Sequence, residues 1–272
     1  VIDFESSVQM ARVIGSSMAR IADAQLVASA VPKGDLDSVD IAELHRATSG
    51  SIMAGISSLL EYAWRRHFVA AGRRAGYLRS RGEDGLTGVE MAVGFADLVG
   101  YTVLSQELEE ADLAALVERF EMLAHDVVTG LGGRVVKMIG DEAMFVVDEA
   151  VHAARIGLTL SEAYADDELL SDVRVGIAFG PVLLREGDYF GRVVNLASRL
   201  VNLGKPGTVL TSEEVHSVLE GDAEFSWRRL RGRSIKDIGP VDVWVLRRPQ
   251  ADGDGGVPRA QRRNDLRWSR RR

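Results

Sequence analysis

The hydrophobic pattern of this chain changes its period near residue 85, and this change limits the fold more than any other feature. From Phe4 to Ala22, apolar residues recur at helical spacing, and a second helical stripe runs from about residue 40 to 79. Val-Pro-Lys-Gly-Asp at 31–35 separates the two runs and contains the helix-breaking residues proline and glycine. A polar stretch with two glycines follows at 79–85. We therefore expect an all-α segment at 1–85 and a domain boundary at its end.

Beyond residue 85, short β-branched runs alternate with amphipathic stretches. The central order is strand, helix, two strands joined by a turn, helix and strand, which is the β-α-β-β-α-β order of ferredoxin-like folds. The expected strands are 89–95, 134–139, 143–147, 173–179, 182–185, 208–211, 225–230 and 241–247, and the expected helices are 110–130, 149–167, 193–202 and 212–220. The sequence thus predicts an α+β domain at 86–248, in which extra C-terminal strands follow a ferredoxin-like core.

Composition and charge exclude several classes of protein. The chain has no cysteine, which excludes disulfides and thiolate metal sites, and its apolar runs are too short for a membrane span. The net charge is −7, although residues 249–272 carry seven arginines against three aspartates. We interpret these residues as a basic disordered tail behind an acidic body, and we expect no nucleic-acid binding, whose affinity depends on phosphate neutralisation. The simplest interpretation is a cytoplasmic protein, and the first residue, Val1, suggests a piece of a longer chain.

Two carboxylates stand at turns between predicted strands. Asp97 follows the strand at 89–95, and Asp141 lies in the Gly-Asp-Glu turn between the strands at 134–139 and 143–147. If the first strand pairs beside that hairpin, the two aspartates lie about 5 Å apart. Their mutual repulsion then requires a proton or cations between them, and an all-oxygen ligand set indicates Mg²⁺ or Mn²⁺. Taken singly, each aspartate is more typical of an ordinary turn than of a metal site.

A third motif lies in the helix predicted at 193–202. Asn195 and Arg199 are four residues apart and so share one helical face. An amide and a guanidinium on one face suit a ribose and a phosphate. Without other motifs, a solvated helix face with one buried asparagine is the better explanation of the pair.

Together these blocks resemble the catalytic domain of the class III nucleotidyl cyclases over about residues 89–248. The family pattern has a Phe-x-Asp-x-x-Gly-Phe-Thr opening, a Lys-x-x-Gly-Asp hairpin and an Asp-x-x-Gly-x-x-Val-Asn-x-Ala-Ser-Arg stretch. This chain contains all three in order, with Tyr101 in place of the second phenylalanine. The resemblance implies a nucleotide cyclase.

The resemblance also implies roles around the phosphates. Asp97 and Asp141 would hold two Mg²⁺ or Mn²⁺ ions, and Arg199 would stabilise the transition state of an in-line attack by the ribose 3′-hydroxyl on the α-phosphorus. Lys236, in Ile-Lys-Asp-Ile-Gly at 235–239, resembles the lysine that grips the terminal phosphates. Arg233 is close enough in sequence to share that role.

For the nucleoside, the resemblance implies that Lys137 and Asp188 read adenine and that Asn195 positions the ribose. A lysine can donate to an adenine ring nitrogen, and an aspartate can accept from the exocyclic amine. Guanine presents an oxygen and a protonated ring nitrogen there, and leaving both partners mismatched costs on the order of 1–3 kcal/mol each. The expected substrate is therefore ATP, and the expected products are 3′,5′-cyclic AMP and pyrophosphate.

Members of this family place each site at a dimer interface, with the metal ligands from one protomer and the base, ribose and transition-state residues from the other. The resemblance therefore implies a homodimer with two symmetric sites and an inactive monomer. The stretch 180–187 is shorter than in animal relatives, which predicts a reduced dimerisation arm.

The helical segment at 1–85 resembles the end of the regulatory domain in acid-responsive actinobacterial cyclases. Its implied role is to hold the catalytic pair in an active or an inactive arrangement. His45 and His67 lie in this segment, and histidine titrates in the range needed to sense acid. We expect activity to rise as the pH falls toward about 6.

Three other interpretations remain open at this stage. A guanylyl-type or diguanylate cyclase shares the fold, although the second family has an aromatic residue where Ala143 stands. A catalytically inactive cyclase-homology module would bind nucleotide or dimerise. Such modules usually lose a metal-binding aspartate or the arginine, whereas this chain retains Asp97, Asp141 and Arg199. A nucleic-acid binder is disfavoured by the acidic body.

Overall fold

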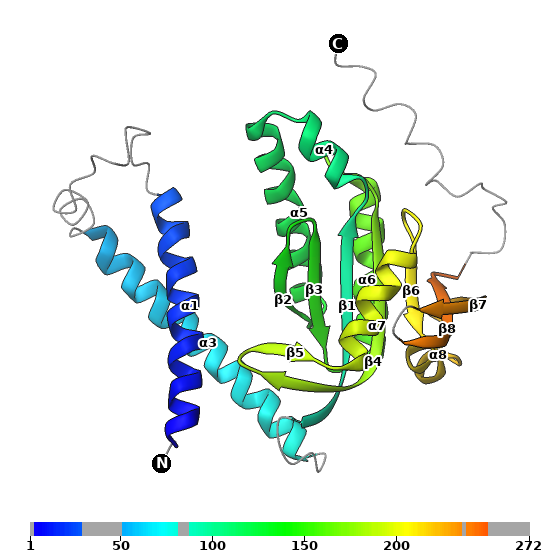
Figure 1. Cartoon of the computed structure of the whole chain (residues 1–272), viewed down its shortest axis with the longest axis horizontal. Coiled ribbons are helices and arrows are strands. Elements are labelled where there is room, and N and C mark those ends of the chain that lie inside the picture. The colour runs from blue at the N-terminus through cyan, green and yellow to red at the C-terminus, as the bar shows by residue number, and fades with distance from the viewer. Residues whose placement is uncertain (1–2, 29–50, 81–86, 236–237, 250–272) are drawn as a thin grey trace. The chain divides into compact units, whose positions relative to one another are not determined.

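The computed structural model of the chain describes residues 3–28, 51–80, 87–235 and 238–249 (Figure 1). The chain divides into two compact units, residues 1–85 and 86–272. Several sequence features fall outside the described residues, namely the break at 31–35, His45, Lys236 and the arginine-rich tail.

The first unit contains helices α1 (Phe4–Ala28) and α3 (Ser51–Ser80), as the helical periodicity predicts. Asp3 caps α1, because its carboxylate accepts hydrogen bonds from the backbone N–H and the hydroxyl of Ser6, both at 2.8 Å. On α3, the rings of Trp64 and Phe68 stack one turn apart, with centroids separated by 5.3 Å. No helix in the described part of the chain is long and apolar enough to cross a membrane.

The second unit is built on a mixed sheet whose strands run in the order β2-β3-β1-β4-β6-β8-β7, with β5 paired to β4 outside this path. The pairing of β4 with β6 is parallel and the other pairings are antiparallel. The strands are β1 (Thr87–Leu98), β2 (Arg134–Ile139), β3 (Glu142–Val147), β4 (Val173–Arg185), β5 (Asp188–Phe190), β6 (Val209–Ser212), β7 (Ser226–Ile235) and β8 (Gly239–Arg247).

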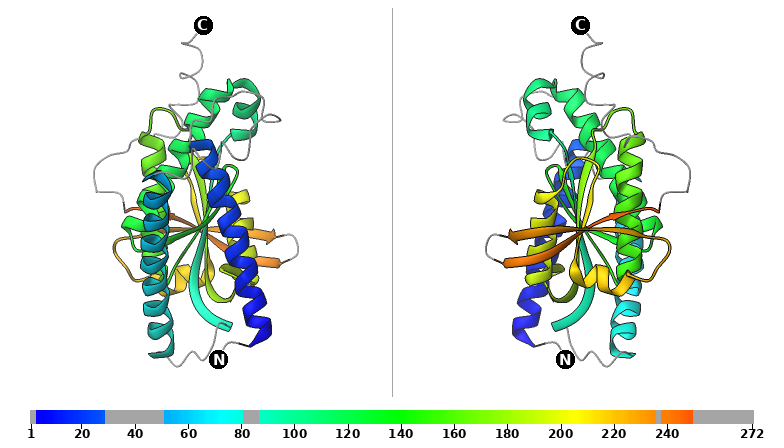
Figure 2. Two further views of the ribbon diagram at one scale, coloured as in Figure 1. Left: turned by 90° about the vertical axis from the view of Figure 1, so that its left-hand side faces the viewer. Right: turned by 90° about the vertical axis from the view of Figure 1, so that its right-hand side faces the viewer.

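Helices cover both faces of this sheet (Figure 2). They are α4 (Tyr101–Glu107), α5 (Glu110–Gly130), α6 (Ala150–Asp166), α7 (Arg192–Leu203) and α8 (Glu213–Leu219). A Cβ atom added to Gly157 of α6 would meet Ile177, whereas one added to Gly176, the preceding residue of β4, would meet the backbone of α7. Because adjacent residues of a strand point to opposite faces, α6 and α7 lie on opposite sides of the sheet.

The α6 side holds the main hydrophobic core, formed by α5, α6, α8 and alternate residues of β1, β3, β4 and β6. From β1 to β4 the elements follow the expected β-α-β-β-α-β order, with α4 and α5 in the place of the first helix. The predicted α+β fold with a ferredoxin-like core, extra C-terminal strands and preceding helices is therefore confirmed.

Some predicted elements differ from the observed ones. The two strands expected at 173–179 and 182–185 are one continuous strand, β4. Gly180 and Pro181 suggested a break, but β4 pairs only with β1 among the described strands between residues 178 and 182, so its other edge tolerates a proline. Sequence analysis missed α4 and β5, since seven and three residues are too few to show a period.

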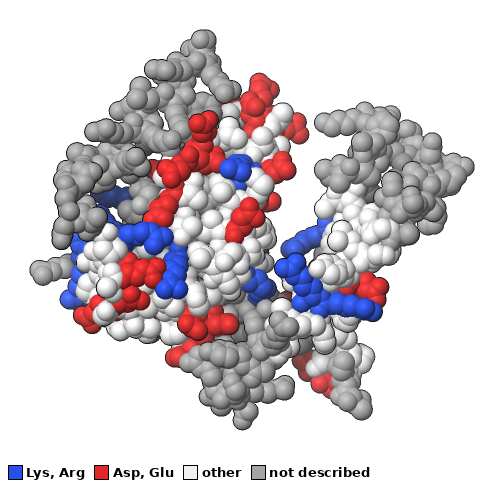
Figure 3. All heavy atoms as spheres, turned by 180° about the vertical axis from the view of Figure 1, so that it is seen from behind, with Lys and Arg blue, Asp and Glu red and all other residues white. Residues whose placement is uncertain are grey.

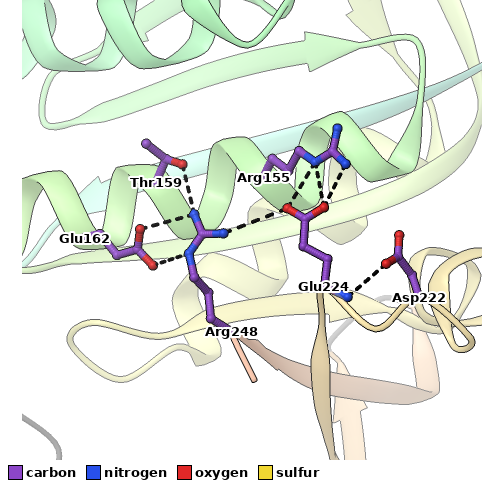
Figure 4. A network of polar contacts seen from close by, with 6 residues as sticks. All are labelled: Arg155, Thr159, Glu162, Asp222, Glu224 and Arg248. Atoms are coloured by element: carbon purple, nitrogen blue, oxygen red, sulfur yellow. Dashed lines mark hydrogen bonds and ion pairs between the residues drawn. The ribbon is translucent and has the colours of Figure 1, made fainter. Parts of the chain in front are cut away.

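A polar network fastens the C-terminal strands to α6 (Figure 4). Arg155 of α6 donates to both carboxylate oxygens of Glu224, which precedes β7, at 2.7–3.1 Å. Arg248, directly after β8, donates to Glu162 of α6 at 2.6 Å. The far edge of the sheet is thus tied to α6 at the start of β7 and at the end of β8.

Charged side chains are unevenly distributed over the second unit (Figure 3). Acidic side chains gather where α4 meets α5, and they include Glu107, Glu109, Glu110 and Asp112. Basic side chains gather over β7 and β8, but Arg229 there pairs with Asp242. Carboxylates thus compensate part of this basic surface.

Candidate active site

The first group of candidate residues lies where β1 ends beside the β2–β3 hairpin. Asp97 of β1 stands opposite Glu142 of β3, and the backbone N–H of Leu98 donates to the carbonyl oxygen of Asp141 at 3.0 Å. Gly140 has a φ of 62°, which a glycine adopts without strain in a tight hairpin turn. The structure therefore brings Asp97, near the end of β1, close to Asp141 in the β2–β3 turn.

Two further side chains belong to this group. Arg174 of β4 is opposite Asp97 on the other side of β1, and its Nε and Nη2 both donate to Asp97 Oδ2. Glu142 follows Asp141 directly. Sequence analysis missed both, although a lone arginine in the apolar run at 173–179 indicates a carboxylate on an adjacent strand.

Burial dominates the electrostatics of this group. Loss of hydration raises the pKa of Asp97, Arg174 opposes that rise, and the charge of Asp141 adds to it. Burial, together with the charges of Asp97 and Asp141, raises the pKa of Glu142 to about 7. The group thus combines three acidic side chains with one guanidinium, and its negative charge is only partly compensated.

The residues present fit hard divalent cations. Their donors are carboxylate oxygens, which Mg²⁺ and Mn²⁺ prefer, and partly buried like charges favour a bound cation. Within the described residues, no three acidic or histidine side chains form a complete metal cage. Mg²⁺ commonly uses one or two carboxylates and completes its shell with water and substrate phosphates, so two carboxylates such as those of Asp97 and Asp141 would suffice to hold it.

The second group links β2 to β5. Lys137 Nζ donates to Asp188 Oδ2, while Asp188 Oδ1 accepts the backbone N–H of Tyr189 at 2.8 Å. The two charged side chains are 37% and 30% exposed, so a ligand can reach both. An ammonium donor beside a carboxylate acceptor presents the pattern that complements the Watson–Crick edge of adenine.

The third group is on α7. Its apolar face, which includes Val193, Leu196 and Leu200, is buried, whereas Asn195 and Arg199 are exposed. The two polar side chains are one turn apart on the uncovered face, as predicted. The structure therefore places six of the seven predicted site residues in three groups, and the seventh, Lys236, is outside the described residues.

Comparison with known proteins gives a consistent result. The model of the adenylate and guanylate cyclase catalytic domain matches residues 88–248. An adenylate cyclase of Streptomyces coelicolor is 34% identical over 92% of this chain and 72% of its own length. An adenylate cyclase of Glutamicibacter nicotianae is 40% identical over 72% of this chain and 51% of its own length.

A pH-sensitive adenylate cyclase of Mycobacterium tuberculosis, MT1302, is 34% identical over 62% of this chain and 43% of its own length. The chain thus spans about half the length of this relative and of the Glutamicibacter enzyme.

Solved structures share the fold. The adenylyl cyclase CyaB from P. aeruginosa superposes with a TM-score of 0.53 at 24% identity and covers 62% of this chain and 98% of its own. A dimeric guanylyl cyclase domain from Blastocladiella emersonii superposes with a TM-score of 0.52 at 22% identity and covers 58% of this chain and 95% of its own.

Proposed function

The chain belongs to the family of adenylate and guanylate cyclase catalytic domains, and we propose that it is an adenylate cyclase that converts ATP to 3′,5′-cyclic AMP and pyrophosphate. The proposal depends above all on the contact between Lys137 and Asp188. The ammonium donates to a ring nitrogen of adenine and the carboxylate accepts from its exocyclic amine. Guanine reverses both hydrogen-bonding patterns, which leaves the two charged groups mismatched.

The carboxylates near the end of β1 act on the phosphates through bound cations. Asp97 and Asp141 would hold the two divalent cations, which would supply Lewis-acid stabilisation for the attacking 3′-hydroxyl and the leaving pyrophosphate. Binding of these cations competes with the ion pair between Asp97 and Arg174.

The exposed face of α7 orients the sugar. Asn195 donates to the ribose and fixes its 3′-hydroxyl in line with the α-phosphorus. Arg199 neutralises the charge that develops on the phosphoryl oxygens, and Lys236 neutralises the departing pyrophosphate. Each of these residues acts by position and charge, and none of them removes the hydroxyl proton.

The active form is a homodimer in which each site takes Asp97 and Asp141 from one protomer and the other residues from its partner. Two exposed apolar side chains support this assembly. Leu183 and Phe190 are paired across the β4–β5 hairpin and are 38% and 47% exposed. Apolar side chains that remain exposed together on a projecting hairpin favour burial against a second copy.

The helical first unit sets the activity of this pair in response to acid. The pH-sensitive relative supports the idea, and α3 carries an exposed histidine, His67, a residue type commonly used to sense acid. We expect the activity of the intact chain, relative to residues 86–272 alone, to rise as the pH falls from about 8 to about 5.5. A flat ratio over this range excludes acid sensing by the first unit.

The decisive experiment is incubation with ATP or GTP in the presence of Mn²⁺ or Mg²⁺, with products separated by chromatography. We expect cyclic AMP from the intact chain and none from the Asp141→Ala variant. Cyclic GMP as the main product indicates a guanylyl cyclase. Nucleotide binding without any cyclic product indicates an inactive homology module.

A further inference from the structure

An irregularity in β2 directs two cationic side chains to the same face of the sheet. Arg134 stands opposite Val146 of β3 and Lys137 stands opposite Met144, with a register shift between Val135 and Lys137. Three steps along β2 thus match two steps along β3, which is the signature of a β-bulge. In a regular strand, residues three apart point to opposite faces. The bulge therefore lets Arg134 join Lys137 on one side.

Both side chains reach β5, which has no backbone pairing with β2. Lys137 contacts Asp188, and Arg134 Nη2 donates to the hydroxyl oxygen of Tyr189 at 2.8 Å. The Arg134 guanidinium also lies 5.3 Å from the centroid of the Tyr189 ring. The main path of the sheet places β3 and β1 between β2 and β4, the strand to which β5 is paired. Side chains alone thus fasten this part of the β4–β5 hairpin to β2.

The two cross-links differ in what surrounds them. Tyr189 is 5% exposed, whereas Lys137 and Asp188 are partly open to solvent. Arg134 Nε is buried and has no hydrogen-bond partner within the described residues, so the tyrosine hydroxyl and ring are the contacts that hold this guanidinium in place. The buried Arg134–Tyr189 contact therefore keeps its geometry when a ligand binds to the exposed Lys137–Asp188 pair.

We propose that Arg134 and Tyr189 are positioning residues for purine selection, an inference that rests on the proposed function. Their link holds β5 against β2, so that the Asp188 carboxylate stays beside the Lys137 ammonium while both contact the base. Neither Arg134 nor Tyr189 touches the reacting atoms. Without the link, the Lys137–Asp188 pair is the remaining hydrogen bond between β5 and β2 in the described part of the chain, and adenine must break or share that pair when it binds.

The test compares two tyrosine-to-phenylalanine variants. Tyr189→Phe keeps the ring but removes the acceptor for Arg134. Tyr164→Phe is the matched control, because it removes a buried hydroxyl that donates to the carbonyl oxygen of Phe120 at 2.7 Å on the other side of the sheet. For Tyr189→Phe we expect the KM for ATP to rise and the ATP-over-GTP ratio of kcat/KM to fall, each roughly tenfold, with little change in kcat. For Tyr164→Phe we expect lower thermal stability and unchanged selectivity.

A second variant tests whether the two residues act through each other. Arg134→Met should lower selectivity as much as Tyr189→Phe, and the double variant should be no worse than either single one. Additive losses, or unchanged selectivity in Tyr189→Phe, overturn the proposal.

A measurement without substrate separates this proposal from the proposed function. Amide hydrogen exchange at residues 188–190 should accelerate in Tyr189→Phe and not in Tyr164→Phe; equal protection in both overturns the positioning role, whether or not the enzyme turns over. Failure of the wild-type chain to form cyclic AMP overturns the proposed function, and the exchange result then decides the positioning role alone.

Discussion

The two faces of the catalytic sheet carry opposite kinds of side chain, although the same strands supply both. On the α6 side, Ala92, Ala96 and Phe145 are fully buried in the main core. On the α7 side, the same strands present Asp97 and Glu142, and Arg174 of β4 joins them. Because side chains alternate along a strand, a rigid apolar face fixes the backbone that aims the charged residues. The comparison teaches that site substitutions on the α7 side should affect chemistry more than folding, and core substitutions the reverse.

The largest expected effect tests this separation directly. The Asp97→Ala variant should form cyclic AMP at least about a hundredfold more slowly, because it lacks one of the two proposed metal ligands. Its free energy of unfolding should change by no more than about 1 kcal/mol, since burial and the charge of Asp141 outweigh the favourable contact with Arg174 and already raise the pKa of the Asp97 carboxyl group. Activity assays and urea denaturation measure the two quantities. Asp126→Ala, which removes an exposed carboxylate from α5, should change neither, and a collapse of stability in Asp97→Ala contradicts the separation.

Two glycines test how tightly each face is packed. A Cβ atom at Gly176 would lie 2.4 Å from the Val201 nitrogen and 2.5 Å from the Ala197 oxygen, both backbone atoms of α7. Because backbone cannot yield, Gly176→Ala should cost about 3 kcal/mol, and it should displace the helix that carries Asn195 and Arg199.

Gly157→Ala makes the matched substitution on the core face. Its Cβ atom would lie 2.7 Å from Ile177 Cδ1, the end of a side chain that can change rotamer. Alanine also stabilises a helix interior by about 0.5–1 kcal/mol relative to glycine, so the net cost should stay below about 1 kcal/mol. Thermal denaturation of both variants measures the two losses of stability. Equal losses would contradict the expectation that α7 packs more tightly against the sheet than α6 does.

Metal binding should raise the free energy of unfolding through the carboxylates on the α7 side of the sheet. Mn²⁺ at about a hundred times its dissociation constant should add about 2.7 kcal/mol to the free energy of unfolding and raise the melting temperature of the wild-type chain. In Asp97→Asn the shift should largely vanish. In Arg174→Met it should grow, since the guanidinium that occupies Asp97 is gone. Calorimetric melting without nucleotide provides the readout, and identical shifts in all three proteins would place the metal elsewhere.

Local chemistry explains what could be predicted from the sequence. The β2–β3 hairpin follows from its Gly-Asp turn between two β-branched runs, and its pairing with the first strand places Asp97 near Asp141. The shared face of Asn195 and Arg199 follows from helical geometry alone. The hairpin turn and the shared helical face depend on neighbours in the sequence, whereas the approach of Asp97 to Asp141 also requires that the first strand pair with the hairpin.

Other features depend on contacts between distant segments, which the sequence pattern does not reveal. Arg174 interrupts an apolar run and so indicates a carboxylate partner, but only the pairing of β4 with β1 identifies that partner as Asp97. The bulge in β2 leaves no local signal in the sequence. Without it, Arg134 and Lys137 are three residues apart in a regular strand and are expected on opposite faces. The family resemblance implies a shared role for Lys137 and Asp188 in reading adenine, whereas their contact and the link from Arg134 to Tyr189 become visible only in the folded chain.

The smallest expected effect concerns the loop that joins the core to the site. Although burial raises the pKa of Asp167, the backbone N–H groups of Leu169 and Leu170 and the Arg119 guanidinium lower it more, so its net pKa falls below 3.8. In the same loop, the Ser171 hydroxyl donates to the carbonyl oxygen of Val99 at 2.6 Å, two residues beyond Asp97.

A carboxyl group with a lowered pKa stabilises the folded chain above its unfolded pKa, and this contribution is lost as the pH falls through the folded value. Asp167→Asn should therefore lower the free energy of unfolding by about 1 kcal/mol at pH 7, and the difference from wild type should narrow as the pH falls below 3.8. Asp166→Asn, an exposed neighbour, serves as the control in denaturant titrations across pH. A difference that stays constant with pH would mean that the Asp167 side chain acts through packing, and that its charge does not help to hold the strand end beside the active site.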